Sequence, residues 1–170
     1  QPTLGGSEYL AVLHDLEAGV PPQVNWEKER ATCQLIRQGI QGGQIHSAHD
    51  LSSGGLAVAL AECILAGGNN PCGAEVAIPV GERADVELFG ETHGRFLVSV
   101  SPEEATIFEE LAADNGVMAL DMGRVGGDHQ AALAALGGQH GEGGRHGGLA
   151  HTALAADPDQ AALEQIGKVG

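Results

Sequence analysis

The chain has 170 residues, of which 42% are hydrophobic but only 3% aromatic, and it contains 27 glycines. This length is sufficient for one domain with its own core, and the composition favours aliphatic side chains packed between helices and a sheet. The formal charge is −15, from 8 Lys and Arg against 23 Asp and Glu. The sequence shows no basic patch of the kind that attracts nucleic acids or anionic membranes, so we expect neither as a partner.

Cysteine usage and hydropathy point to a cytoplasmic protein. The three cysteines, Cys33, Cys63 and Cys72, have no CxxC spacing, a pattern typical of reduced thiols. The sequence contains no apolar run of membrane-spanning length and no basic-then-apolar leader, so we expect neither insertion nor export. Because the chain begins at Gln1 instead of Met, we expect it to be either trimmed or cut from a larger polypeptide.

Periodicity and capping residues predict an alternation of helices and strands. The expected elements, in chain order, are a helix at 9–16, a helix at 25–40, a strand at 44–49, a helix at 54–66, strands at 74–79 and 95–100, a helix at 101–114 and a strand at 117–125. Asn25 is the expected N-cap of the second helix. Cys33, Ile36 and Ile40 are expected to line one face of that helix. The order predicts an α/β fold (α+β layered) in which helices cover a sheet.

The composition changes at about residue 128. Residues 137–148 are rich in glycine and histidine and lack apolar periodicity, so we expect a flexible segment there. Residues 156–166 have the pattern of a final short helix. The tail histidines leave open a weak transition-metal tract, against the simpler alternative of a disordered terminus. We therefore divide the chain into a domain core at 1–127 and a divergent, partly disordered tail at 128–170.

The clearest chemical signature is the segment HDLSSGG at 49–55. Asp50 ends a strand, and Ser52 and the two glycines lead into a helix whose first N–H groups lack partners and whose dipole favours anions. This combination suits a metal–phosphate group, with Asp50 as the carboxylate ligand. The alternative is that Asp50, Ser52 or Ser53 simply caps the helix.

Two histidines of the preceding strand, His46 and His49, have the spacing His-x-x-His. Residues three apart on a strand point to opposite faces, so we do not expect them to share a metal ion. We expect His49 to be packed or hydrogen-bonded within the core.

Four segments resemble one known family: LGGSEYL at 4–10, SAHDLSSGGLAVALAE at 47–62, LFGETHGRFLVSV at 88–100 and GRVGG at 123–127. They are similar, in this order, to the phosphoribosylformylglycinamidine synthase family. The synthetase subunit of this family consists of two halves, and the similarity is to the C-terminal domain of the second half. That domain resembles the C-terminal domains related to aminoimidazole ribonucleotide synthetase. The resemblance covers roughly residues 1–127. It implies a layered domain with a sheet covered by helices.

The resemblance also implies a place in purine biosynthesis. Members of this family are ATP-dependent carbon–nitrogen ligases that convert formylglycinamide ribonucleotide to the amidine with ammonia derived from glutamine. Their catalytic histidine belongs to an N-terminal domain that this chain lacks. We therefore expect no catalytic residue in the chain and no ligase activity from the chain alone. The alternative function is a non-catalytic structural or regulatory nucleotide-binding domain of the same superfamily.

The family's functional residues map onto two places in this sequence. Asp50 matches an aspartate that helps to ligate Mg²⁺ at a nucleotide, ATP or ADP, bound between domains, and Ser52 matches a serine that touches the same nucleotide. Glu91, Thr92 and His93 match a Glu-Ser-Gln stretch that contacts the ribonucleotide substrate, with Thr-His in place of Ser-Gln.

The alternative for the second place is structural. In that interpretation the GETHG loop is a tight connection between strands, in which Glu91 pairs with Arg95.

The implied partners follow from the same resemblance. They are the ATP-binding N-terminal domains of the same subunit and the glutamine amidotransferase component that supplies ammonia. The isolated domain is also a candidate homodimer, because it would lack the partner that covers its apolar surface.

Overall fold

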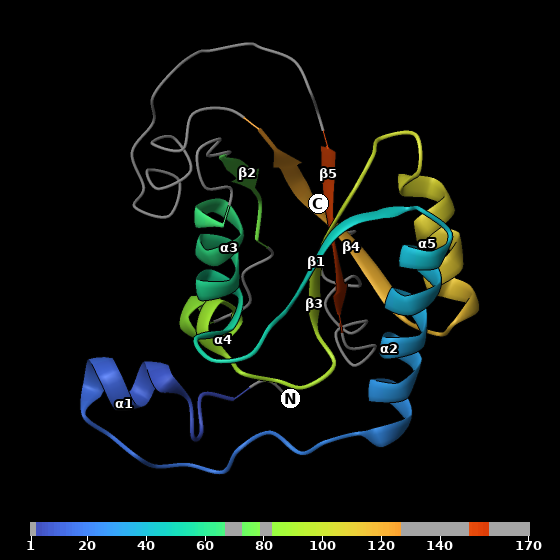
Figure 1. Cartoon of the computed structure of the whole chain (residues 1–170). Helices are drawn as coiled ribbons and strands as arrows, with labels where there is room; N and C mark the ends of the chain where they lie inside the picture. The colour runs from blue at the N-terminus through green and yellow to red at the C-terminus, as the bar shows by residue number, and fades with distance from the viewer. Residues whose placement is uncertain (1–2, 67–72, 79–82, 127–149, 157–170) are drawn as a thin grey trace, which may run out of the picture.

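The computed structural model describes residues 3–66, 73–78, 83–126 and 150–156. In this part of the chain, a five-stranded sheet lies between two layers of helices (Figure 1). The helices are α1 (Glu8–His14), α2 (Trp26–Gln41), α3 (Gly55–Leu65), α4 (Ala84–Phe89) and α5 (Ala105–Asp114), and the strands are β1 (Ile45–Asp50), β2 (Ala74–Val76), β3 (Phe96–Val100), β4 (Met118–Val125) and β5 (Ala150–Ala156). The predicted α/β layered fold is confirmed.

All neighbouring strands of the sheet are antiparallel, in the order β1-β3-β5-β4-β2. The central strand is β5, which pairs with β3 on one side and with β4 on the other. The sequence predicts no strand in this alanine-rich segment, because alanine has a low preference for strands. The division of the chain at residue 127 stays a prediction, but the sheet includes a strand from beyond that residue.

Each face of the sheet carries its own core, because successive side chains of a strand point to opposite faces. Val98 and Val100 of β3 face α2 and α5, whereas Leu97 faces α3. The first core consists of Leu35, Ile36, Ile45, Val98, Val100, Phe108, Ala112 and Val117. The second consists of Leu51, Leu56, Ala59, Leu60, Leu97 and Met122. Figure 1 shows α3 and α4 on one side of the strands and α2 and α5 on the other.

Helix α2 confirms the predicted cap but corrects the predicted face. The Asn25 side chain accepts hydrogen bonds from the backbone N–H groups of residues 27 and 28. Cys33 is exposed and Ile40 is 54% exposed, so the expected face was wrong in these two positions. The buried positions are Thr32, Leu35, Ile36 and Gly39. A pattern built on large apolar residues missed the glycine and the threonine of the true contact stripe.

Gly39 belongs to that stripe because the helix comes very close to the sheet there. A Cβ atom at Gly39 would lie 2.7 Å from Ile45 Cδ1 and 3.2 Å from Phe108 Cε2. The absence of a side chain therefore lets α2 pack directly on β1 and α5.

Several boundaries differ from the expectation. Helix α5 begins at Ala105 after a turn, because the Ser101 hydroxyl donates to the Glu104 carboxylate at 2.9 Å instead of capping a helix at that point. Strand β2 is only three residues long, and helix α4 was not predicted. The segment 137–148 and, except for its first residue, the helix expected at 156–166 lie outside the described residues. That first residue, Ala156, is the last residue of β5. None of the helices in the described part of the chain combines the length and hydropathy that crossing a membrane requires.

Candidate functional site

The loop between β1 and α3 carries the predicted nucleotide residues on its surface. Asp50, at the last position of β1, is exposed, and so are Ser52 and Ser53. The N-cap of α3 is Gly54, with φ of 80°, and it makes no side-chain capping bond. The alternative in which Asp50, Ser52 or Ser53 caps α3 is therefore wrong, and these side chains are available to a ligand.

The histidine that precedes Asp50 fixes the end of the strand. Its Nδ1 atom lies 2.7 Å from the backbone oxygen of Asp50, and its Nε2 atom lies 3.2 Å from Glu62 Oε2 on α3. His46 instead approaches Glu104 Oε2, at 3.3 Å, just before α5. The two side chains thus approach helices on opposite faces of the sheet, as expected of residues three apart on a strand.

The described residues contain no group of three or more His, Cys, Asp or Glu side chains that could hold a metal ion by themselves. A Mg²⁺ ion commonly binds through one or two carboxylates, with phosphate oxygens and water completing its octahedron. The exposed carboxylate of Asp50 fits that mode of binding. It does not fit a closed site made of protein side chains alone.

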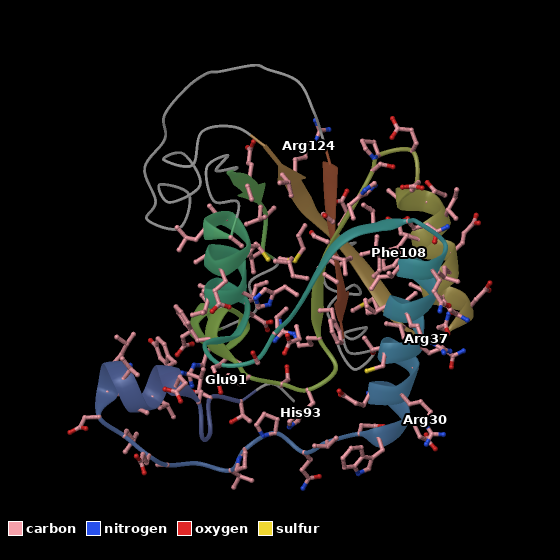
Figure 2. The ribbon with its side chains drawn as sticks, in the orientation of Figure 1. Arg30, Arg37, Glu91, His93, Phe108 and Arg124 are labelled. Carbon is pink, nitrogen blue, oxygen red and sulfur yellow. The ribbon has the colours of Figure 1, made fainter. Side chains whose placement is uncertain are left out.

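The side chain of Glu91 connects two helix starts. Its Oε1 atom accepts a hydrogen bond of 2.8 Å from the Glu8 backbone N–H, in the first turn of α1, and another of 2.8 Å from the Gly54 backbone N–H. Figure 2 shows Glu91 beside α1 and α4. A carboxylate at a helix N-terminus is stabilised by the helix dipole and by charge-assisted hydrogen bonds.

Backbone packing brings the same segments together. A Cβ atom at Gly55, where φ is 65°, would lie 2.8 Å from the backbone oxygen of Gly90 and 2.9 Å from that of Leu88. Only glycine fits this contact. The ring of Tyr9 on α1 stacks on Phe89 at the end of α4, with centroids 4.5 Å apart and planes 20° apart.

Arg95 supports the GETHG loop from inside. It is only 6% exposed, and its Nη1 atom donates to Thr92 Oγ1 at 3.1 Å and to the Gly90 oxygen at 3.4 Å. Thr92 is half-buried, whereas His93 is exposed. The three residues expected to bind a substrate therefore have different surroundings, and the exposed His93 is the most accessible of them.

Three of the four quoted motifs thus meet at one place, and the fourth lies elsewhere. The segments at 4–10, 49–55 and 88–94 are joined through Glu91, the close contact at Gly55 and the aromatic stack. The described residues of the GRVGG motif, 123–126, lie near the edge of the sheet opposite to β1, where Gly123 pairs with Val76 and the Gly126 N–H donates to the Gly73 oxygen. Sequence reasoning located the loops but missed the bridging role of Glu91 and the bracing role of Arg95, for which the sequence offers no local signal.

Residues 2–135 match the family described as "AIR synthase related protein, C-terminal domain". The chain belongs to this family. The predicted resemblance is therefore confirmed at the level of the family. The matched region ends before the central strand β5, which begins at residue 150.

Similar proteins are named as subunits of phosphoribosylformylglycinamidine synthase, the family that the four sequence segments resemble. The chain is 48% identical over 126 residues to phosphoribosylformylglycinamidine synthase subunit PurL from Moorella thermoacetica, covering 74% of this chain and 17% of that protein. It is 45% identical over 136 residues to the PurL subunit from Anaeromyxobacter sp., covering 75% of this chain and 18% of that protein. The chain thus spans less than a fifth of the length of these relatives. The structure of PurLQS from Thermotoga maritima is more distantly similar, with a TM-score of 0.49 and 24% identity. The similarity covers 67% of this chain and 19% of that chain.

Proposed function

We propose that the chain is a C-terminal-type domain of a formylglycinamidine ribonucleotide synthase, an ATP-dependent carbon–nitrogen ligase of purine biosynthesis in the cytoplasm. The observation that carries this proposal is the 48% identity to a PurL subunit over 74% of the chain. Identity at this level over about three quarters of the chain supports a related function more strongly than a shared fold does. Its partners would be ATP-binding N-terminal domains of the same subunit and an amidotransferase that supplies ammonia.

Within that enzyme, the proposed role of this domain is to hold one side of an interdomain nucleotide site. Asp50 offers a hard carboxylate oxygen to Mg²⁺, and the Ser52 hydroxyl offers a hydrogen bond to the same ATP or ADP. When bound, the ion would neutralise phosphate charge and orient the nucleotide. His49 holds the backbone oxygen of Asp50 at 2.7 Å and so limits movement of the strand end that carries the carboxylate.

The GETHG loop is the proposed contact with the ribonucleotide. The exposed imidazole of His93 is its most accessible polar group, and Thr92 Oγ1 is held by Arg95 at 3.1 Å. Glu91 Oε1 is already engaged by two backbone donors. Substrate contact by this loop is therefore best supported for His93.

Calorimetric titration with ADP of the full-length subunit, in which this domain is joined to its N-terminal domains, tests the nucleotide site when it is run in Mg²⁺ and in EDTA. We expect Mg²⁺-dependent binding that Asp50→Asn weakens about tenfold or more, because the variant loses a charge in contact with the ion. Asp114→Asn is the control, since Asp114 is an exposed residue at the end of α5. Equal affinities of the wild type and Asp50→Asn would contradict the assignment of Asp50. An absence of Mg²⁺-dependent binding in the wild type would contradict the nucleotide site of this domain.

Activity of the isolated chain provides a second test. No residue in it matches a catalytic residue of the family, so we expect no amidine formation from formylglycinamide ribonucleotide, ATP and ammonia. Turnover by the chain alone would show that the catalytic machinery is not confined to the N-terminal domains.

A further inference from the structure

We infer that Glu91 is a positioning residue: its carboxylate sets the conformation of the β1–α3 loop that carries Asp50 and Ser52, and it does not itself contact a substrate. The effect on nucleotide binding rests on the proposed function, whereas the effect on the loop does not.

The first support is the geometry of the carboxylate. One oxygen, Oε1, accepts two hydrogen bonds of 2.8 Å from Glu8 and Gly54, which lie 83 and 37 residues away along the chain. Hydrogen bonds to a charged acceptor are about twice as strong as those between neutral groups. Glu91 therefore links the start of α1 to the start of α3, two segments that are distant in sequence.

The second support is that α3 lacks a cap of its own. In a capping box, a Glu side chain within the helix reaches back to the backbone N–H of the N-cap residue. Here the N-cap is Gly54, and Glu91 supplies the same hydrogen bond from a distant loop. Gly54 and Gly55 both have positive φ, at 80° and 65°. Glycine is the residue with most conformational freedom to lose on folding, so this loop depends on restraint from outside.

The third support is that Glu91 is itself held from both sides. The backbone oxygens of Leu88 and Gly90 pack against Gly55, and the buried Arg95 donates to Gly90 and to Thr92. To reach a substrate, the Oε1 atom would have to leave two backbone donors. The exposed His93 of the same loop is under no such constraint.

Amide hydrogen exchange measured by NMR tests the effect on the loop. In Glu91→Ala, we expect the amides of Glu8 and Gly54 to exchange about tenfold faster or more, because each loses a charge-assisted hydrogen bond. Glu91→Gln retains an acceptor oxygen and should keep most of the protection. It also keeps the test decisive if the alanine variant does not fold. Glu110→Ala is the control, because Glu110 is exposed on α5, away from this loop.

Titration of the full-length subunit with Mg²⁺ and ADP tests the consequence for the nucleotide site. We expect Glu91→Ala to weaken binding about tenfold and Glu91→Gln to restore it to within about threefold of the wild type. If Glu91→Gln weakens binding as much as Glu91→Ala while Gly54 stays protected, the charge itself contacts the ligand and the inference is wrong. Unchanged exchange at Gly54 in Glu91→Ala would also overturn it. If the wild type binds no ADP, the proposed function fails, but the exchange rates still decide whether Glu91 fixes the loop.

Discussion

On the face of the sheet covered by α2 and α5, the helices pack through a continuous apolar core in which Leu35 and Phe108 are fully buried. On the face covered by α3, a smaller core lies beside a loop of exposed polar residues and two glycines with positive φ. The helix starts differ in the same way. Asn25 caps α2 from the adjacent position, whereas the N-cap of α3 is hydrogen-bonded by Glu91.

This comparison separates two ways of building a helix start. Helix α2 has its own N-cap, Asn25, so the residue at which it begins depends little on the rest of the chain. Helix α3 depends on a residue 37 positions away, and its loop is therefore sensitive to changes at a distance. A loop that is ordered by tertiary contacts, with exposed side chains, is a suitable place for ligand binding. We accordingly expect the first face to contribute most of the stability, and the proposed ligand site lies on the second.

The largest effect should come from the core of the α2–α5 face. Replacing Phe108 with Ala leaves a cavity at a fully buried position, and we expect a loss of about 3–5 kcal/mol in the free energy of unfolding. Ile107→Ala is the control. Ile107 is next to Phe108 in the chain but is 52% exposed, so the loss in the free energy of unfolding should be about 1 kcal/mol or less. Urea denaturation followed by circular dichroism measures both values. Equal losses in the two variants would show that this core is not the stabilising one.

The next effect concerns the contact between the two motif loops. Gly55→Ala places a Cβ atom on a left-handed backbone and also brings it against the backbone oxygen of Gly90. We therefore expect a loss of about 2–4 kcal/mol in the free energy of unfolding. Gly43→Ala is a matched control, because Gly43 has φ of 80° but no atom within 4 Å of the added Cβ. It should lose only about 1–2 kcal/mol. If urea denaturation gives the same loss for both, the close approach of the loops does not contribute.

A smaller effect distinguishes the two helix starts directly. Asn25→Ala removes an acceptor for two backbone N–H groups, and we expect a loss of about 1 kcal/mol. Ser53→Ala should change the free energy of unfolding by less than about 0.5 kcal/mol, because Ser53 is exposed and does not cap α3. A loss for Ser53→Ala as large as that for Asn25→Ala would mean that α3 does have a local cap.

The smallest effect belongs to the start of α4, on the α3 side of the sheet. Hydrogen bonding to Arg83 lowers the pKa of Asp85 below its ordinary value of 3.8. A carboxyl group whose pKa is lowered in the folded state stabilises the protein at pH values above its unfolded pKa. This stabilisation is lost as the pH falls through the folded pKa. The melting temperature of the wild type should therefore be slightly higher than that of Asp85→Asn at pH 7. This difference in melting temperature should vanish in acid. Both side chains are solvent-accessible, so added salt should also reduce it. A difference that persists in acid would point to another cause.

Much of the architecture could be predicted from the sequence, because its signals are local. The Asn25 cap, the apolar run of α3 and the alternation along β3 each depend on residues within a few positions of one another. The loop bearing Asp50 and Ser52 was located for the same reason. The family resemblance also came from contiguous motifs, and it is confirmed by the match over residues 2–135.

What the tertiary structure alone decided involves residues that are distant in sequence. Strand β5 is alanine-rich and becomes a strand by pairing with β3 and β4 on both sides, a driving force that its own composition does not reveal. Gly39 is buried only because Ile45 and Phe108 approach it. Glu91 could be identified as a polar residue in a turn, but its two donors come from helix starts elsewhere in the chain. Local sequence thus determined most of the helices and strands and the loop that carries Asp50 and Ser52. Long-range hydrogen bonding and close packing determined the centre of the sheet and the group that holds this loop in place, because both depend on partners that no short segment contains.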